Sequence, residues 1–428
     1  MEVYLILKRK TFLMAFFIFF LFSFQSIFAQ VDTSKLNITS GAALLIEPST
    51  NKIIYEKNSK EKMYPASTTK IMTALLTLEN CKLTDIVTVS QDAVSSITPA
   101  YATVFINPGE ELTVEQLLNV LLIPSGNVAG NILAEHISGS IENFANLMNK
   151  RAQELGCTNT HFTNSYGFHD DNHYSCAYDL YLISKEAMKY DVFREIVKKT
   201  EYYLPPTNNY KKEDRNYRTT NDLIKPDSSK SSDNYYYEYA IGIKTGYTSQ
   251  AKNCLVSAAN KDGLELYCVI LGAGTNSQGL DQRYLETKKL YDFAYDNYFF
   301  RTLREENSIF RQIEIKNATN KTKTLDVLVK DNITALVDSE NLYSTIPPTT
   351  TFKENLEAPI QKGEVIGSIK YVIDGTTYES DLIAANDVKK SYFIYFIIAF
   401  GIVIFILLIL LIRNKLNRKK VKYRNYRL

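Results

Sequence analysis

The chain has 428 residues, of which 45% are hydrophobic, so it is long enough for more than one folded domain with a sizeable core. Its formal charge of +2 conceals a segregation, because residues 1–29 carry a net +2, the residues after 390 carry a net +8, and the middle therefore carries a net −8. An acidic middle section binds polyanions poorly, so we expect no nucleic acid among the partners of this protein.

The N-terminal segment has the organisation of a secretory signal. The basic run Lys8-Arg9-Lys10 precedes an apolar run from Phe12 to Phe24, and the small residue Ala29 ends the segment. This order is typical of a signal peptide over residues 1–29, with cleavage after Ala29. An uncleaved membrane anchor is the alternative, because Ile27 is larger than the small residue usual near a cleavage site.

The C-terminal end is predicted to hold a membrane anchor. Residues 391–412 contain an uncharged apolar run, Tyr392 to Ile412, that is long enough to cross a bilayer as one helix. Because eight basic residues lie in 413–428, the positive-inside rule predicts a cytoplasmic tail and a single-pass cell-membrane protein whose body is extracytoplasmic. A basic amphipathic helix on the membrane surface is the alternative, but the run has no polar face.

Cysteine and histidine usage predicts neither a disulfide framework nor a metal site. The five cysteines are few and scattered, none has Cys-x-x-Cys spacing, and the four histidines show no zinc-binding pattern. An odd number leaves at least one cysteine unpaired within the chain. Two of them could face each other across a hairpin, although apolar core filler is the favoured interpretation. The five are Cys81, Cys157, Cys176, Cys254 and Cys268, of which Cys254 and Cys268 are the two in question.

In chain order, residues 41–54 predict a strand, a turn and a strand, and Pro65 to Lys70 then leads into an apolar run at helical spacing. Proline is favoured at a helix start, so we expect a helix to begin near Pro65. Ser67 and Lys70 are three residues apart and would then share one face of that helix. A desolvated lysine can take the proton of a serine hydroxyl, and unpaired N–H groups of a first helical turn stabilise negative charge. This stretch is a candidate acylation site.

Ser-x-x-Lys is a weak motif by itself. It also occurs at Ser49–Lys52, Ser59–Lys62 and Ser249–Lys252, and only the Ser67 copy opens a strongly apolar helical segment. The alternative for any single copy is an ordinary helix start with a solvated lysine.

A second candidate site lies between two predicted helices. Residues 113–122 have helical spacing, Pro124 ends that helix, and a further helix is predicted from Val128 to His136. The turn between them presents Ser125 to relay a proton and Asn127 to bind a peptide carbonyl. A plain helix cap is the alternative. The stretch Ser232-Asp233-Asn234 offers a rival Ser-x-Asn, but it lies in a polar segment, 225–234, without a rigid scaffold.

The third candidate is a strand at residues 241–247, followed by a hairpin over 253–271. Such a strand can pair with an extended peptide, and Lys244 and Thr245 would then offer a charge and a hydroxyl to a substrate carboxylate. Gly246 permits the close approach of another backbone. A solvated edge lysine is the alternative.

Other segments are interpreted as structural. The loop-rich segment 156–179 holds three histidines, His161, His169 and His173, for which hydrogen-bonded loop positions are favoured over catalysis. Tyrosines in 235–239 are expected to pack. A helix at 283–293 closes a first domain of residues 30–300, and short alternating segments predict a small β-rich domain at 301–388.

The three motifs occur in the order Ser-x-x-Lys, Ser-x-Asn and Lys-Thr-Gly, which is the arrangement found in serine β-lactamases and penicillin-binding proteins. With the flanking residues, the chain resembles the D-alanyl-D-alanine carboxypeptidases, the low-molecular-mass penicillin-binding proteins. Further resemblance lies in Gly156 to Asn164, His173 to Asp179, and Pro359 to Gly367. The resemblance implies an α+β fold: a β-lactamase/transpeptidase-like domain, with an antiparallel sheet packed against helices, then the small all-β domain and one transmembrane helix.

The resemblance also implies a reaction. Ser67 would attack the terminal D-Ala-D-Ala bond of peptidoglycan stem pentapeptides, with Lys70 as its base and Ser125 as a proton relay. The implied partners are these stem peptides, β-lactam antibiotics as acylating inhibitors, and the membrane, with no cofactor. The implied substrate-binding residues surround that serine, and backbone N–H groups of Ser67 and Tyr247 would form the oxyanion hole. They are Asn127, Lys244, Thr245, Gly246, Tyr247 and Arg283, although Arg283 could equally make a surface ion pair.

Two rival functions share this fold. A β-lactamase would deacylate rapidly, usually through a glutamate between the second and third motifs, and no Glu-x-x-Leu-Asn sequence occurs there. A catalytically weak penicillin-binding scaffold is the other rival, and three intact motifs argue against it. The apolar C-terminal run also differs from the amphipathic helix by which many family members are anchored.

Overall fold

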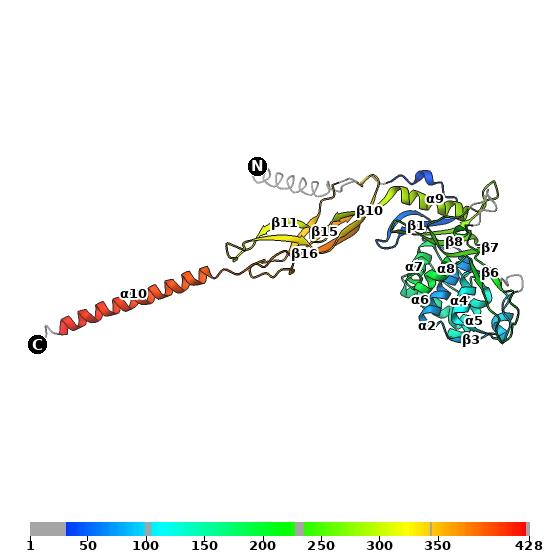
Figure 1. Cartoon of the computed structure of the whole chain (residues 1–428), viewed down its shortest axis with the longest axis horizontal. Helices are drawn as coiled ribbons and strands as arrows, with labels where there is room; N and C mark the ends of the chain where they lie inside the picture. The colour runs from blue at the N-terminus through cyan, green and yellow to red at the C-terminus, as the bar shows by residue number, and fades with distance from the viewer. Residues whose placement is uncertain (1–30, 99–103, 227–234, 343–344, 425–428) are drawn as a thin grey trace, which may run out of the picture. The chain divides into compact units, whose positions relative to one another are not determined.

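A computed structural model of the protein describes residues 31–98, 104–226, 235–342 and 345–424. The predicted signal peptide and the rival Ser232-Asp233-Asn234 stretch lie outside these residues. The chain divides into two compact units, Met1–Phe299 with Asp338–Leu342, and Phe300–Val337 with Tyr343–Leu428 (Figure 1).

The first unit is built on a five-stranded antiparallel sheet with the order β2-β1-β9-β8-β7. The predicted strand-turn-strand near residue 41 and the hairpin after residue 253 are confirmed. Cys268 pairs with Ser257 in the β8–β9 register, so the suggested facing of Cys254 and Cys268 is wrong, and all five cysteines are free. The strands are β1 (Ala42–Glu47), β2 (Lys52–Lys57), β7 (Ala240–Thr248), β8 (Lys252–Lys261) and β9 (Leu264–Ala273).

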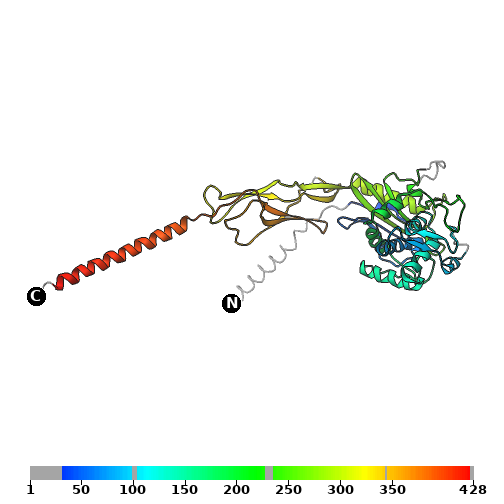
Figure 2. The ribbon, with the colours of Figure 1, turned by 60° about the horizontal axis from the view of Figure 1, so that its bottom comes forward.

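Helices cover both faces of this sheet. In Figure 1, α9 lies above the sheet and the labelled helices α2, α4, α5, α6, α7 and α8 lie below it, and Figure 2 gives a second view of the same ribbon. α9 contacts β8 and β9, while α7 contacts β1 and β9. α2 is buried at the centre of the lower layer, against α4, α5 and α7. The helices are α2 (Lys70–Asn80), α3 (Gln91–Ser95), α4 (Val114–Leu122), α5 (Asn127–Ser138), α6 (Ile141–Glu154), α7 (Ala177–Ala187), α8 (Asp191–Lys198) and α9 (Gln282–Asn297).

The observed helix starts differ from the predicted ones by one residue or by one turn. Thr113 caps α4 in a capping box with Gln116, so the predicted helix begins one residue later, at Val114. α5 begins at Asn127 and reaches Ser138, which is longer than the predicted 128–136. A single turn of 3₁₀ helix, η2 (Ala66–Thr69), precedes α2, so the first turn after Pro65 is tighter than the α-helical turn that the sequence predicted.

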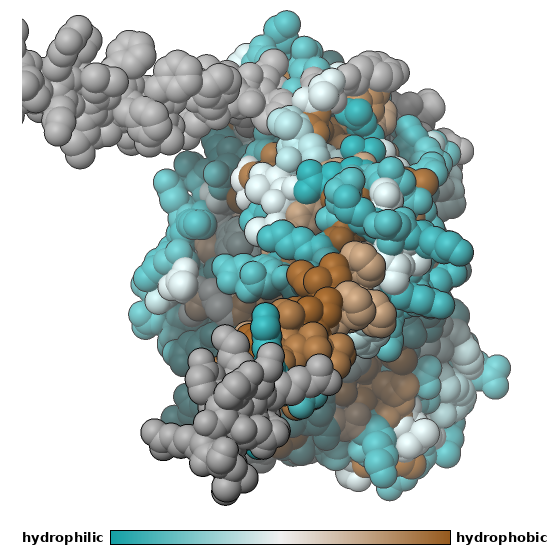
Figure 3. Space-filling view, turned by 90° about the vertical axis from the view of Figure 1, so that its left-hand side faces the viewer, coloured by the Kyte–Doolittle hydropathy of each residue, from teal (hydrophilic) through white to brown (hydrophobic). Residues whose placement is uncertain are grey.

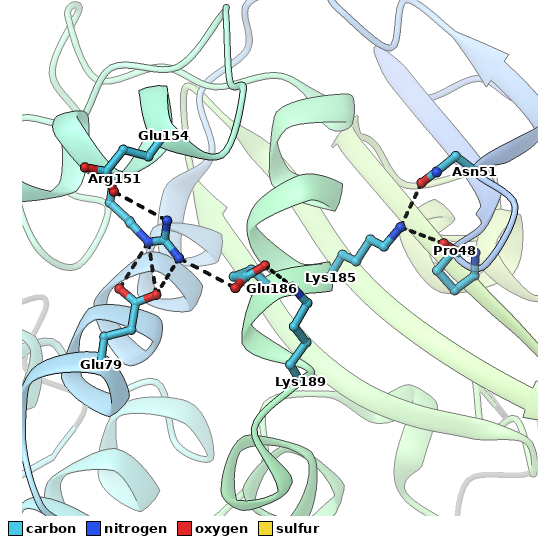
Figure 4. A network of polar contacts seen from close by, with 8 residues as sticks. All are labelled: Pro48, Asn51, Glu79, Arg151, Glu154, Lys185, Glu186 and Lys189. Carbon is cyan, nitrogen blue, oxygen red and sulfur yellow. Dashed lines mark hydrogen bonds and ion pairs between the residues drawn. The ribbon is translucent and has the colours of Figure 1, made fainter.

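A polar network fixes the far end of α2 (Figure 4). The Arg151 guanidinium on α6 binds the Glu79 carboxylate of α2 through both Nε, at 3.0 Å, and Nη2, at 2.7 Å. The same guanidinium also lies 3.6 Å from the Glu186 carboxylate of α7. On the other side of α7, Lys185 donates hydrogen bonds to the β1–β2 turn. Three helices and one turn of the sheet are thus held together around the helix that follows Ser67.

Two short antiparallel pairs and two further 3₁₀ turns complete this unit. The pairs are β3 (Ile86–Thr88) with β4 (Glu111–Thr113), and β5 (Glu201–Tyr203) with β6 (Asn216–Arg218), and the turns are η1 (Ser34–Leu36) and η4 (Asp222–Ile224). The buried Glu110 carboxylate accepts hydrogen bonds from Arg215 and Thr207 at 2.8 and 2.7 Å, which ties the segment before β4 to the segment around β6.

The second unit contains a separate antiparallel sheet with the order β11-β12-β16-β15-β14. Asp374 and Gly375 join β15 to β16 with φ values of 48° and 79°, the positive pair that a two-residue hairpin turn favours. The strands are β11 (Ile309–Glu314), β12 (Thr324–Val329), β14 (Thr349–Phe352), β15 (Val365–Ile373) and β16 (Thr376–Ala384), with β10 (Tyr298–Arg304) and β13 (Ile333–Asp338) forming a two-stranded pair.

The chain ends in one long helix, α10 (Phe393–Arg424), which includes the predicted apolar run. Its segment Phe393–Leu416 is long and apolar enough to cross a membrane, and none of it is buried against the rest of the protein. Figure 3 shows apolar surface, in brown, gathered near the centre of one view of the molecule.

Candidate active site

Ser67 lies in the 3₁₀ turn η2, directly ahead of α2. Ala66 has a positive φ of 47°, and the Thr68 hydroxyl donates a hydrogen bond to the Pro65 carbonyl at 2.7 Å, which holds the turn. Ser67 is half-buried, while the residues on both sides of it are buried. The turn therefore presents the Ser67 hydroxyl from a rigid segment.

Lys70 begins α2, and its ammonium group is fully buried. Its Nζ lies 2.9 Å from Ser67 Oγ, 2.7 Å from Asn127 Oδ1 and 2.8 Å from the Tyr166 carbonyl oxygen. Burial, reinforced by the charge of Lys244, holds the pKa of Lys70 well below its ordinary value. A neutral amine can donate to the two carbonyl oxygens and direct its lone pair at Ser67 Oγ, which is the geometry of a general base.

The turn between α4 and α5 faces this lysine. Ser125, 7% exposed, has a positive φ of 62°, and Gly126 N–H donates to the Val120 carbonyl at 2.9 Å. A Cβ on Gly126 would lie only 2.9 Å from that carbonyl oxygen, so this close turn requires glycine. Two residues past Ser125, Asn127 points its amide oxygen at Lys70.

A loop that the sequence interpretation did not select forms the wall opposite β7. The Asn164 side chain accepts hydrogen bonds from Gly167 N and Phe168 N at 2.8 and 3.0 Å. These bonds bend the loop so that the Tyr166 carbonyl oxygen accepts a hydrogen bond from Lys70. Gly167 has a φ of 87°, and a Cβ there would lie 1.8 Å from the Ala66 carbonyl oxygen. A backbone carbonyl has no residue-type signature, which is why the motif search missed it.

Strand β7 supplies the other wall, and over the described residues it is one of the two edge strands of the sheet. Lys244 is buried, and burial, with a contribution from Arg283, lowers its pKa to about 7. The Thr245 hydroxyl lies 2.5 Å from that of Thr220. A Cβ on Gly246 would lie 3.0 Å from Ser67 N, so β7 runs directly beside the N–H of the serine turn.

Arg283 lies at the start of α9, and its role in substrate binding stays a prediction. Its guanidinium pairs with Asp281 at 2.9 Å and also donates to the Gly246 carbonyl at 3.2 Å. Its side chain is only 14% exposed, so the ion pair with Asp281 is largely buried and does not lie at the surface as expected.

A cleft of about 300 Å³ opens between these walls. Among the predicted residues, Ser67, Asn127 and Tyr247 line it, and the Tyr247 side chain is 65% exposed. Further lining residues come from the wall loop and from the end of β7, which the motifs did not identify. They are Tyr166, Gly167, Phe168, His169, Thr248 and Gln250.

Two of the three loop histidines, His161 and His173, do not line the cleft at Ser67. His173 is buried, and its Nδ1 accepts from Thr163 N at 3.0 Å while its Nε2 lies 2.8 Å from Thr69 Oγ1. Burial lowers its pKa to about 3, so the ring stays neutral and supports the segment after Ser67. His161 bonds a loop carbonyl at 2.7 Å. Across the described parts of the chain, no group of three or more metal-ligating side chains is found.

A buried lysine bonded to a serine hydroxyl, an amide beside them and an open edge strand together define the class of serine peptidases and β-lactamases that act through an acyl-enzyme. Two sequence profiles match the chain: D-alanyl-D-alanine carboxypeptidase (Peptidase S11) over residues 29–275, and the C-terminal domain of penicillin-binding protein 5 over residues 300–390. The chain therefore belongs to the D-alanyl-D-alanine carboxypeptidase family, and it is a serine-type hydrolase.

Individual relatives agree with this assignment. The D-alanyl-D-alanine carboxypeptidase DacF of Bacillus subtilis is 36% identical over 87% of this chain and 92% of its own length. DacA of Haemophilus influenzae is 30% identical over 90% of this chain and 95% of its own length. Penicillin-binding protein 5 of Haemophilus influenzae, a solved structure, superimposes with a TM-score of 0.60 at 26% identity, over 82% of this chain and 98% of that one. The predicted transpeptidase-like α+β fold with a C-terminal all-β domain is confirmed.

Proposed function

We propose that Ser67 is the nucleophile of a D-alanyl-D-alanine carboxypeptidase that removes the terminal D-alanine from peptidoglycan stem pentapeptides. The observation that carries this proposal is the buried Lys70 amine, 2.9 Å from Ser67 Oγ, with a pKa lowered by burial. No metal or cofactor enters the reaction as we propose it.

The substrate would add to the open edge of β7 as an antiparallel strand. Its terminal carboxylate would meet Thr245 and the charge of Lys244, and its penultimate carbonyl would lie at Ser67. The close approach of Gly246 to Ser67 N supports an oxyanion hole made by the N–H groups of Ser67 and Tyr247. Each such donor contributes roughly 3 kcal/mol to transition-state stabilisation in other enzymes.

In the first step, Ser67 Oγ would attack the carbonyl carbon of the penultimate D-alanine while Lys70 takes the hydroxyl proton. The proton would then pass through Ser125 to the amine of the departing D-alanine as the peptide bond breaks, leaving an ester on Ser67. Water hydrolyses this ester in the second step, regenerating the serine hydroxyl and releasing the shortened peptide. Asn127 would bind the substrate amide and orient Lys70, and Arg283 would act through the Gly246 backbone.

Release of D-alanine from a peptide ending in D-Ala-D-Ala tests this proposal. We expect release by the unmodified protein, a loss of at least a thousandfold in Ser67→Ala and Lys70→Met, and none from the same peptide ending in a carboxamide. Penicillin labelling without any D-alanine release would contradict the proposal and favour a penicillin-binding scaffold. Rapid turnover of penicillin would favour a β-lactamase instead.

We also propose that α10 spans the cell membrane once, with residues 413–428 in the cytoplasm and both folded units outside. The support is the length and apolar surface of α10 together with the eight basic residues that follow its apolar part. β-Lactam antibiotics would act as acylating inhibitors at Ser67.

A further inference from the structure

A second cavity, of about 500 Å³, lies next to the active-site cleft in the first unit. Gln250 lines both cavities, so they share a wall just beyond the end of β7. The second cavity lies between the segment ahead of η2, which contributes Lys62 and Tyr64, and the start of β8, which contributes Lys252. Nothing in the reaction described above uses this space.

The lining of this cavity is suited to an anionic ligand with some apolar surface. Lys62 and Lys252 provide two exposed ammonium groups, and the Lys62 ammonium lies 4.2 Å from the centre of the Tyr174 ring. Asp171 is the one carboxylate among the described lining residues, and it lies 3.6 Å from the His169 ring nitrogen. The described lining therefore carries a net positive charge.

Two glycines keep the floor of this cavity open. A Cβ on Gly41 or on Gly272 would lie 2.7 or 2.8 Å from the terminal methyl of Met63, so any side chain there would displace that methyl. Both glycines and Met63 line the cavity. The space is thus formed by close packing of backbone from β1, β9 and the loop before η2.

The direction of the substrate on β7 determines what would reach this cavity. If the terminal carboxylate lies at Thr245 and the reacting carbonyl at Ser67, the preceding residues of the peptide pass Thr248 and then Gln250. An extended strand advances about 3.3 Å per residue. The part of the peptide on the N-terminal side of the acylated residue is therefore directed toward the second cavity.

We propose that this cavity is a subsite for a carboxylate carried by the stem peptide on the N-terminal side of the acylated residue, with Lys62 and Lys252 as its cationic partners. This inference rests on the proposed function, which it deepens by assigning a binding site for the non-reacting part of the substrate. Binding energy from such a remote part orients the reacting bond.

Two peptides ending in D-Ala-D-Ala, identical except that one carries a free upstream carboxylate and the other a carboxamide there, test the subsite. For the unmodified protein we expect kcat/KM for D-alanine release to be about three- to tenfold higher with the carboxylate peptide, chiefly through KM. In the double variant Lys62→Gln, Lys252→Gln, the two peptides should react at equal rates. A preference for the carboxylate that survives in the double variant would overturn the proposal.

Lys60→Gln is the matched control, because it removes a charge two residues from Lys62 at a position that does not line the cavity, and it should retain the preference. Acylation by benzylpenicillin, which lacks the upstream peptide, should be unchanged in both the double variant and the Lys60→Gln control. Normal acylation and D-alanine release with no preference for the carboxylate would overturn the subsite alone. Failure of the unmodified protein to acylate or to release D-alanine would instead contradict the proposed function.

Discussion

At Lys70, the surroundings favour the uncharged amine over the ammonium form. The side chain is fully buried, and Lys244 adds a second positive charge nearby, so both effects lower its pKa. The carbonyl oxygens of Tyr166 and Asn127 fix the direction of the amine without requiring it to be charged. The lowered pKa and the fixed direction of the amine both support the proposed role of Lys70 as the base for Ser67.

The pKa directions predict a bell-shaped pH dependence of kcat/KM for peptide hydrolysis. The rate should rise about tenfold per pH unit while Lys70 loses its proton, and fall above about pH 7 as Lys244 loses the charge that attracts the substrate carboxylate. Lys244→Arg, whose side chain stays charged, should move the alkaline limb to higher pH. An alkaline limb that stays in place in that variant would show that another group produces it.

Gly167 is predicted to be essential to the site although it carries no side chain. In Gly167→Ala the new methyl would collide with the Ala66 carbonyl, so the Ser67 turn or the Tyr166 carbonyl must move, and acylation should slow at least tenfold. Gly263→Ala is the matched control, since it has the same φ of 87° but open space around it. Equal acylation rates in the two variants would contradict this account.

Sequence reasoning found those site residues whose chemistry lies in a side chain at a regular spacing. Ser67 and Lys70 share one helical turn, and Ser125 with Asn127 occupies a turn that Pro124 makes evident. The Tyr166 carbonyl and the hydroxyl of Thr220 could not be found in this way, because they reach the site through loops whose path depends on distant contacts.

At the scale of elements, α2 is held at both ends. Its first residue is Lys70, and its last turn carries Glu79, which binds the Arg151 guanidinium bidentately (Figure 4). Both side chains are about 20% exposed, so this pair is better shielded from water than a surface salt bridge. The network stabilises the arrangement of α2, α6 and α7 below the sheet.

Arg151→Met should lower the free energy of unfolding by about 1–2 kcal/mol, because it leaves the Glu79 carboxylate without its main partner in a half-buried position. Lys150→Met is the control, since its pairing with Glu154 at 3.9 Å is exposed, and it should cost less than about 0.5 kcal/mol. Urea unfolding of both variants measures the difference. Equal stabilities would mean that the network contributes no more than a surface pair.

Strands and helices with a clear period were predictable, and their exact starts were not. Alternation and turn residues located β1, β2, β8 and β9, whereas the 3₁₀ turn η2 depends on the Thr68–Pro65 hydrogen bond and on the positive φ of Ala66. Neither the hydrogen bond nor the positive φ produces a periodic pattern in the sequence. The pairing of β1 with β9 likewise depends on residues far apart in the chain.

At the scale of the whole molecule, α10 is the one helix among the described residues that is long and apolar enough to cross a membrane. Over Phe393–Leu416 the helix is apolar and exposed, a surface that water solvates poorly and a bilayer accommodates. Composition alone was sufficient to locate this helix, because a membrane span requires only length and apolar side chains. No comparable sequence pattern indicates how the two units are arranged relative to α10.

A chain that stops at Lys390 should be released from the membrane fraction while retaining penicillin binding, because the cleft and its walls lie entirely in the first unit. Fractionation of cells that produce the full-length and the shortened chain measures this difference. If the shortened chain stays with the membranes, the N-terminal segment is an uncleaved anchor and α10 is not the principal attachment.

The most direct test of the central claim is the intact mass of a protein comprising residues 30–390 after reaction with benzylpenicillin. We expect one covalent penicilloyl adduct, located on the peptide that contains Ser67 and absent in Ser67→Ala. Ser49→Ala, which alters another Ser-x-x-Lys copy, should keep the adduct. An adduct that persists in Ser67→Ala, or the absence of any adduct in the unmodified protein, would contradict the assignment of Ser67 as the nucleophile.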